Sequence, residues 1–143
     1  MKRWPRNAIV CLAILVSAMM GCVAAKATAE EKPTVQNQPP VVVQTVPQAG
    51  DTKVDPATKE ITVTFSKKMS GGMSWSSAFE NSEPQATGKP HYLADGRTCV
   101  MPVKLEPGRT YGFWLNSQKF SNFKDSKGRS AVPYLLIFET AKK

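Results

Sequence analysis

The chain has 143 residues, which is enough for one domain of ordinary size and too few for several. Its formal charge of +8 comes from 19 basic and 11 acidic residues, and three basic ones, Lys2, Arg3 and Arg6, lie in the first eight positions. Without residues 1–21 the chain keeps 16 basic and 11 acidic residues, a net charge of +5 that is spread along the sequence. Proteins that bind nucleic acid gather such charge into a groove or stripe, so we expect no nucleic acid among the partners.

The N-terminus carries the pattern of a secretory signal peptide. Its basic start is followed by an uncharged, mostly apolar run from Ile9 to Gly21, shorter than the roughly 20 residues that a membrane-spanning helix needs. A buried amphipathic helix is disfavoured because the run has no polar face. We therefore expect residues 1–21 to be a signal peptide and the protein to be exported.

Two cleavage sites are compatible with this signal. Gly21-Cys22 resembles the end of a lipobox, where a lipidated cysteine becomes the mature N-terminus, although Met19 stands where leucine is usual. The alternative is an A-x-A site at Ala27-Thr28-Ala29, further from the apolar run, which would give a freely secreted chain. Cys22 is thus the lipidation candidate, and we expect membrane contact only through that lipid anchor.

The composition changes twice after the signal. Residues 22–40 are rich in Ala, Glu, Gln, Thr and Pro and hold no aromatic residue, so we expect a disordered tether. From residue 41 apolar residues recur with a period of two, which indicates half-buried strands. The predicted strands are 41–46, 61–65, 73–79, 91–93, 97–105, 110–117 and 134–140.

Turn signals separate most of these strands, including Asp95-Gly96, which suits a tight hairpin, and Pro107-Gly108. Pro102 indicates an edge position or a bulge in its strand. The number and spacing of strands predict an all-β fold, an immunoglobulin-like β-sandwich of about seven strands over residues 41–143. A small barrel would give the same pattern.

No group of residues has the pattern of an enzyme or a metal site. His91, the one histidine, and Cys99 flank the Asp95-Gly96 turn, but no third group that would orient the histidine is marked. Asp51 and Asp55 are too few for calcium, and clustered zinc ligands are lacking. We expect a non-catalytic domain without metal or cofactor, in which Cys99 is a packed, inert thiol.

Four aromatic residues fall outside the cleanest inward-facing sets: Trp75, Trp114, Phe120 and Phe123. Exposed together, they could stack on a sugar ring or anchor a protein partner. The alternative is that Trp114 covers one face of a sheet while Phe120 and Phe123 pin the long loop over residues 119–130 to the sandwich.

Several short motifs occur in a recognisable order. They are Thr45-Val46-Pro47, Val54-Asp55-Pro56, Phe65-Ser66-Lys67-Lys68-Met69-Ser70, Asp95-Gly96-Arg97-Thr98, Glu106-Pro107-Gly108-Arg109-Thr110-Tyr111 and Phe138-Glu139-Thr140. Together they resemble a bacterial Ig-like domain of the type named after the surface-layer protein SbsA, over about residues 41–141. Arg129 departs from that pattern, because the segment Asp125-Ser126-Lys127-Gly128 is usually followed by asparagine.

The resemblance implies a β-sandwich used as a spacer, adhesion or interaction module on envelope or secreted proteins, with no catalytic residue to carry over. Independently, Tyr111 near the start of its strand is placed to form a tyrosine corner. We expect a partner to be another envelope protein or a polysaccharide. The alternative function is a carbohydrate-binding, lectin-like module that uses the exposed aromatics.

Overall fold

The computed structural model describes residues 31–142, and every regular element within them is a β-strand. Over this part of the chain no helix is long and apolar enough to cross a membrane. The predicted signal peptide and Cys22 lie outside the described residues. The strands are β1 (Val42–Val46), β2 (Glu60–Phe65), β3 (Trp75–Ser77), β4 (Gln85–Ala86), β5 (His91–Tyr92), β6 (Thr98–Lys104), β7 (Thr110–Leu115) and β8 (Tyr134–Glu139).

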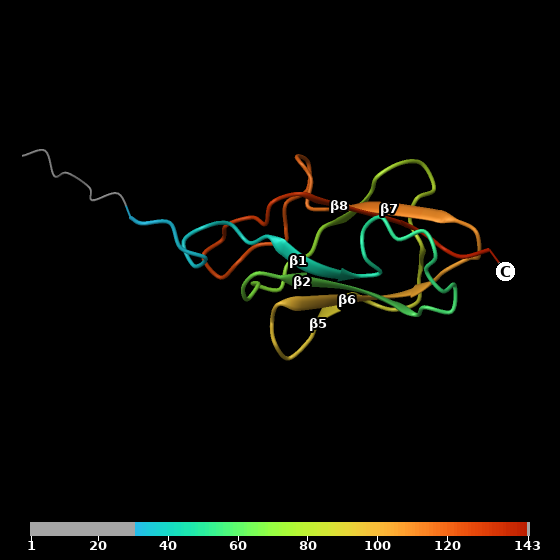
Figure 1. The fold of residues 1–143 in the computed structure, drawn as a ribbon. Helices are drawn as coiled ribbons and strands as arrows, with labels where there is room; N and C mark the ends of the chain where they lie inside the picture. Colours follow the sequence, from blue (N-terminus) through green and yellow to red (C-terminus); the bar gives the residue numbers. More distant parts are fainter. Residues whose placement is uncertain (1–30, 143) are drawn as a thin grey trace, which may run out of the picture. The chain divides into compact units, whose positions relative to one another are not determined.

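The strands form two antiparallel sheets that pack face to face (Figure 1). One sheet has the order β1-β2-β6-β4, with β5 also paired to β6, and the other has the order β3-β7-β8. The predicted all-β, immunoglobulin-like sandwich is confirmed, with eight strands instead of about seven. The additional strand is β4, which lies in a stretch without apolar alternation and pairs with β6 only at Gln85 and Ala86.

Alternation along the long strands builds the core between the sheets. In β2, the buried residues Ile61, Val63 and Phe65 alternate with partly exposed threonines, because successive side chains of a strand point to opposite faces. β7 and β8 repeat the pattern, so that aromatic rings of Tyr111 and Phe138 meet at 5.6 Å between centroids. The core cluster between the sheets also includes Cys99, Val103, Phe113, Leu115 and Leu136 from the long strands.

Tyr111 forms the predicted tyrosine corner. Its hydroxyl accepts a hydrogen bond from the backbone amide of Glu106 at 2.8 Å, while its ring is only 1% exposed. The bond ties the turn at Pro107-Gly108 to the first residues of β7. Gly108 has φ +63° in that turn, a backbone conformation that glycine adopts without a steric penalty.

Pro102 lies in the middle of β6, and β6 is not an edge strand, so the predicted edge position is wrong. β6 is paired on one side with β2 and on the other with two short strands, β5 at Cys99 and Val100 and β4 at Val103 and Lys104. The Pro102 carbonyl accepts the amide of Thr87, so the nitrogen of Pro102 faces the same side, between those short strands. The missing amide hydrogen therefore breaks no ladder bond.

The described N-terminal segment is attached to the sandwich. Pro40 is buried, and its carbonyl accepts the amide of Val132 at 2.9 Å. The carbonyls of Gln36 and Gln38 accept hydrogen bonds from the Lys67 ammonium. Residues 36–40 thus pack on the domain, whereas we had expected the tether to continue to residue 40. These contacts use backbone groups, which composition does not report.

The chain then passes from one sheet to the other. After β1 it continues through a cis Val46–Pro47 bond to residues that bond the free edge of β8. There the amide of Gly50 donates to the carbonyl of Ile137 at 2.7 Å, and the amide of Glu139 donates to the carbonyl of Asp51 at 2.7 Å. The segment covers this part of the β8 edge, which reduces the unpaired edge of the smaller sheet.

Candidate functional site

The structure does not bring the four aromatic residues that the sequence marks for ligand contact together on one surface. Phe123 is fully buried, and its ring lies 5.0 Å from that of Phe65 and 5.7 Å from that of Trp75, measured between centroids. It pins the loop between β7 and β8 to the core, as the alternative interpretation expected. Phe123 is therefore removed from the possible contact residues.

Trp75 also faces inward. It lies opposite Leu115 in the register of β3 and β7, and its ring meets that of Phe113 edge to face at 5.5 Å between centroids. Its ring is partly buried, and its indole nitrogen is covered without a hydrogen-bond partner in the described residues. Trp75 thus closes the side of the core, where it lines a recess of about 210 Å³ together with Phe113.

Trp114 points away from the core, on the outer surface of the three-stranded sheet. Its register partner in β8 is Leu135, and the next outward pair along these strands is Gly112 and Ile137. Leu135 and Ile137 are each 37% exposed. The ring of Phe79 lies over Gly112, and a Cβ added to Gly112 would stand 2.8 Å from that ring. Phe79, Trp114, Leu135 and Ile137 together form what we call the outer apolar face.

Phe120 is 47% exposed on the loop after β7, where the ammonium of Lys119 lies 5.5 Å from its ring centroid. It does not pin the loop, unlike Phe123. Of the four predicted contact residues, Phe120 is therefore exposed on a loop and Trp114 is partly exposed on a sheet face. The grouping of Phe79, Leu135 and Ile137 around Trp114 depends on strand register, so it could not be predicted from the order of residues along the chain.

His91 and Cys99 do not form a nucleophile–base pair. In the register of β5 and β6, His91 lies opposite Val100 while Cys99 lies opposite Tyr92, so the two side chains occupy opposite faces of the sheet. His91 is exposed, whereas Cys99 is fully buried beside the Met73 sulfur at 3.7 Å. Burial raises the pKa of the Cys99 thiol to about 12, so it stays protonated and unreactive at neutral pH.

The acidic side chains serve local structure. Asp51 accepts the amide of Lys53 at 2.9 Å and Asp55 accepts the amide of Ala57 at 2.8 Å, both two residues further on, as turn-forming aspartates do. Among residues 31–142 no three His, Cys, Asp or Glu side chains are grouped closely enough to hold a metal ion.

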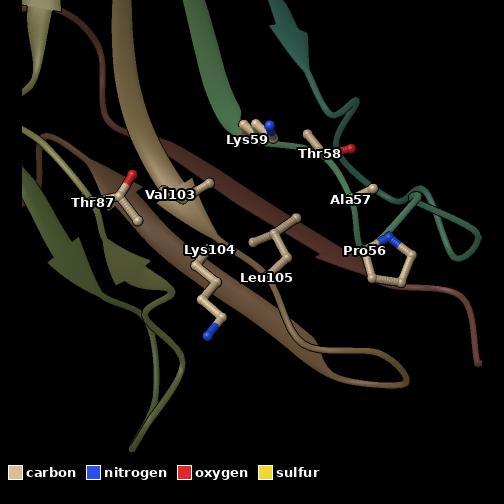
Figure 2. Close-up of a pocket in the computed structure, with 8 residues that line it drawn as sticks. All are labelled: Pro56, Ala57, Thr58, Lys59, Thr87, Val103, Lys104 and Leu105. Carbon is tan, nitrogen blue, oxygen red and sulfur yellow. The ribbon is translucent and has the colours of Figure 1, made fainter.

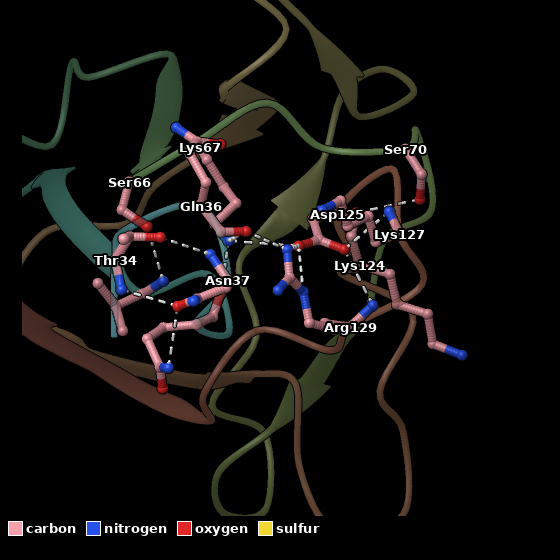
Figure 3. Close-up of polar contacts among 12 residues, drawn as sticks. Thr34, Gln36, Asn37, Ser66, Lys67, Ser70, Lys124, Asp125, Lys127 and Arg129 are labelled. Atoms are coloured by element: carbon pink, nitrogen blue, oxygen red, sulfur yellow. Dashed lines mark hydrogen bonds and ion pairs between the residues drawn. The ribbon is translucent and has the colours of Figure 1, made fainter. Parts of the chain in front are cut away.

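A buried polar cluster joins three distant parts of the chain (Figure 3). The carboxylate of Asp125 is 2% exposed and lies 3.3 Å from the Lys67 ammonium and 2.8 Å from the Arg129 guanidinium. It also accepts the backbone amides of Lys127 and Arg129, each at 3.0 Å. Burial raises the pKa of Asp125, but the bonds donated by Arg129, Lys127 and Lys67 outweigh it and lower the pKa to about 2.

A recess lies between the loop before β2 and the end of β6. Figure 2 shows its lining, in which Val103 and Leu105 form the apolar floor and Lys59 and Lys104 flank it. The recess has a volume of about 390 Å³ and carries no acidic group. Its polar side chains are those of two threonines and two lysines, and no histidine or cysteine lines it.

The comparisons with known proteins agree with this architecture. A family model described as a bacterial Ig-like domain matches residues 36–140, a range that includes the attached segment before β1. The search of curated proteins gave no significant match. Among solved structures, the S-layer protein rSbsC is similar with a TM-score of 0.47 and 16% identity, over 74% of this chain and 14% of that one. With the family model covering most of its length, the chain belongs to the family of bacterial Ig-like domains.

Proposed function

We propose that this protein is a non-catalytic structural and interaction module of an exported protein. It is held at the cell envelope by a lipid on Cys22 or released after cleavage at the alanine site. Domains of this family are structural modules without catalytic activity. The apolar run followed by Gly21-Cys22 supports export and the lipid anchor.

The observation that carries the interaction role is the outer apolar face. Leu135, Ile137 and Phe79 are each more than a third exposed and are neighbours on one sheet surface. A grouped apolar surface of this kind is typical of contact sites, whereas single exposed apolar residues are ordinary. Because the face combines two aliphatic side chains with the rings of Phe79 and Trp114, we expect it to suit a protein of the envelope better than a sugar ring.

Cell fractionation tests export and anchoring separately. We expect the full chain in the membrane fraction, and the Cys22→Ser variant in the soluble exported fraction. Protein that stays in the cytosolic fraction, in both forms, would contradict export. Export with unchanged membrane association of the variant would contradict the lipid anchor alone.

A photo-reactive residue at position 135 tests the outer apolar face in intact cells. We expect a discrete cross-linked protein product there, and none from position 62, which is the matched control on the outward surface of the other sheet. Equal products from both positions would show that the face has no special role.

The carbohydrate-binding alternative has a direct test as well. It requires ring surface, and of the four aromatic residues marked by the sequence Phe120 is exposed and Trp114 is partly exposed on the outer sheet surface. Trp114→Ala removes the larger ring without touching the core. Glycan-array binding by the full chain that this variant loses, with its unfolding midpoint retained, would establish the lectin-like function instead.

A further inference from the structure

Positive charge gathers in a cleft at one end of the sandwich. The cleft has a volume of about 470 Å³, within the range of roughly 300–1,000 Å³ that is usual for ligand sites. Its walls come from Gln36, the residues after β2, the turn before β6 and the loop before β8. Six charged residues line it: Lys67, Lys68, Arg97, Lys127 and Arg129 are cations, and Asp125 is the one carboxylate.

Asp125 is fully engaged within the protein and neutralises only part of this charge. Its bonds to Lys67, Arg129 and two backbone amides leave it 2% exposed. Lys67 is similarly committed, because its ammonium donates to the carbonyls of Gln36 and Gln38 as well as to Asp125. Five cations and one carboxylate leave a net charge of +4 on the walls of the cleft.

Three of the cations are available to a ligand. In the described part of the chain Lys68, Lys127 and Arg97 lie within ion-pair distance of no carboxylate. Asp95, the acid nearest in sequence to Arg97, uses its carboxylate on the amides of Arg97 and Thr98 and on the Thr98 hydroxyl. The aliphatic part of the Lys68 side chain packs against Gly96. Its Cγ lies 3.7 Å from the point where a Cβ on Gly96 would stand, and this contact positions the Lys68 ammonium.

The two guanidinium groups at the cleft are already held in place. Arg97 Nε donates to the carbonyl of Phe65 at 3.1 Å, which leaves its terminal nitrogens free to donate. Arg129 Nε donates to Asp125 at 2.9 Å, and its Nη2 also donates to the Gln36 carbonyl. A fixed guanidinium binds phosphate or sulfate oxygens with little further loss of side-chain freedom.

From this geometry we propose that the cleft binds a phosphate or sulfate group carried on a glycan. A concave site with an excess of positive charge attracts anions, and four net charges favour a group of two or more negative charges over a single carboxylate. The volume leaves room for a sugar beside the charged group. The site lies at the opposite end of β8 from its last residue and does not use the outer apolar face, so it goes beyond the proposed function.

The test uses the full chain, a heparin-derived hexasaccharide as the sulfated glycan, and titration followed by amide NMR shifts and calorimetry. We expect shifts at residues 66–68, 97 and 126–129. Lys68→Gln/Lys127→Gln removes two exposed cations and should weaken binding about tenfold. The matched control, Lys53→Gln/Lys142→Gln, removes the same charge from the cleft at the other end of the sandwich and should weaken it less than about twofold.

Equal weakening by the two double variants, or shifts spread over the whole surface, would overturn the proposal, because either shows unspecific attraction of charge. Displacement of the hexasaccharide by equimolar duplex DNA would overturn it in favour of a nucleic-acid site. Inorganic phosphate that shifts the same amides supports recognition of the tetrahedral anion itself. Both lysines are exposed, so thermal unfolding of the variants should match that of the parent chain.

Discussion

Asn116→Ala tests how the long loop between β7 and β8 is held. Asn116 is 1% exposed and has φ +58°, and its side-chain amide donates to the carbonyls of Phe123 and Ala131, both at 3.0 Å. Its side-chain oxygen accepts the amide of Phe123 at 2.9 Å. One buried side chain thus replaces the backbone partners that a regular strand would have given to this loop.

Removal of the Asn116 side-chain amide leaves two backbone groups without a partner, the Phe123 N–H and the Ala131 carbonyl. The Phe123 carbonyl keeps a partner, because it still accepts a hydrogen bond from the backbone amide of Ala131 at 2.8 Å. Each buried unpaired group costs about 1–3 kcal/mol. The left-handed backbone adds about 1 kcal/mol for alanine. We expect Asn116→Ala to lower the free energy of unfolding by about 4 kcal/mol, a large part of the roughly 5–15 kcal/mol of a typical domain.

Asn81→Ala is the matched control. Asn81 has φ 55° but is exposed, so its replacement adds the cost of a left-handed backbone for alanine and breaks no buried hydrogen bond. It should lower the free energy of unfolding by about 1 kcal/mol. Urea unfolding of the full chain, followed by tryptophan fluorescence, measures both variants. If the two free energies of unfolding agree to within about 0.5 kcal/mol, the reasoning on the buried amide is wrong.

Three further predictions concern other buried groups. Asp125 has a lowered pKa, so its contribution to the free energy of unfolding is complete above about pH 4 and lost as the pH falls toward 2. Urea midpoints measured across this range should show the loss of stability. Asp125→Asn should abolish this pH dependence and should lower the free energy of unfolding by about 3 kcal/mol at pH 7. Cys99 should react with a thiol reagent only after unfolding, and fast labelling of the native protein that mass spectrometry locates at Cys99 would contradict its burial. Tyr111→Phe should cost about 1 kcal/mol in thermal or urea unfolding, because the Glu106 amide loses its partner.

The strands that carry two-residue alternation were predictable, and the irregular ones were not. β2 was expected at 61–65 and spans Glu60–Phe65, because Ile61, Val63 and Phe65 need a common buried face. The hairpin at Asp95-Gly96 was also expected, since the sequence favours a tight turn there. β4 has no such signal: Gln85 and Ala86 are exposed, and their pairing with β6 depends on backbone bonds alone.

The candidate site, like the fold, could be predicted from the sequence only in part. The direction of Trp114 could be predicted, because it falls opposite the alternating apolar residues of β7. β3 is short and has no clear alternation, so the inward direction of Trp75 follows only from its pairing with Leu115. The basic cleft was hidden for another reason. Its cations lie between positions 67 and 129, so the chain looked evenly charged until the ends of β2, β6 and β8 came together.

The attachment of residues 36–40 at one end of the sandwich has a mechanical consequence. The chain enters beside the start of β8, and it leaves after β8 at the other end, where the amide of Ala141 bonds the carbonyl of Val54. A pull between these two points runs along the strands and perpendicular to the hydrogen bonds of β1 with β2. The load would then be shared by the four paired positions of β1 and β2 at once, a shear geometry that resists extension better than unzipping from one end.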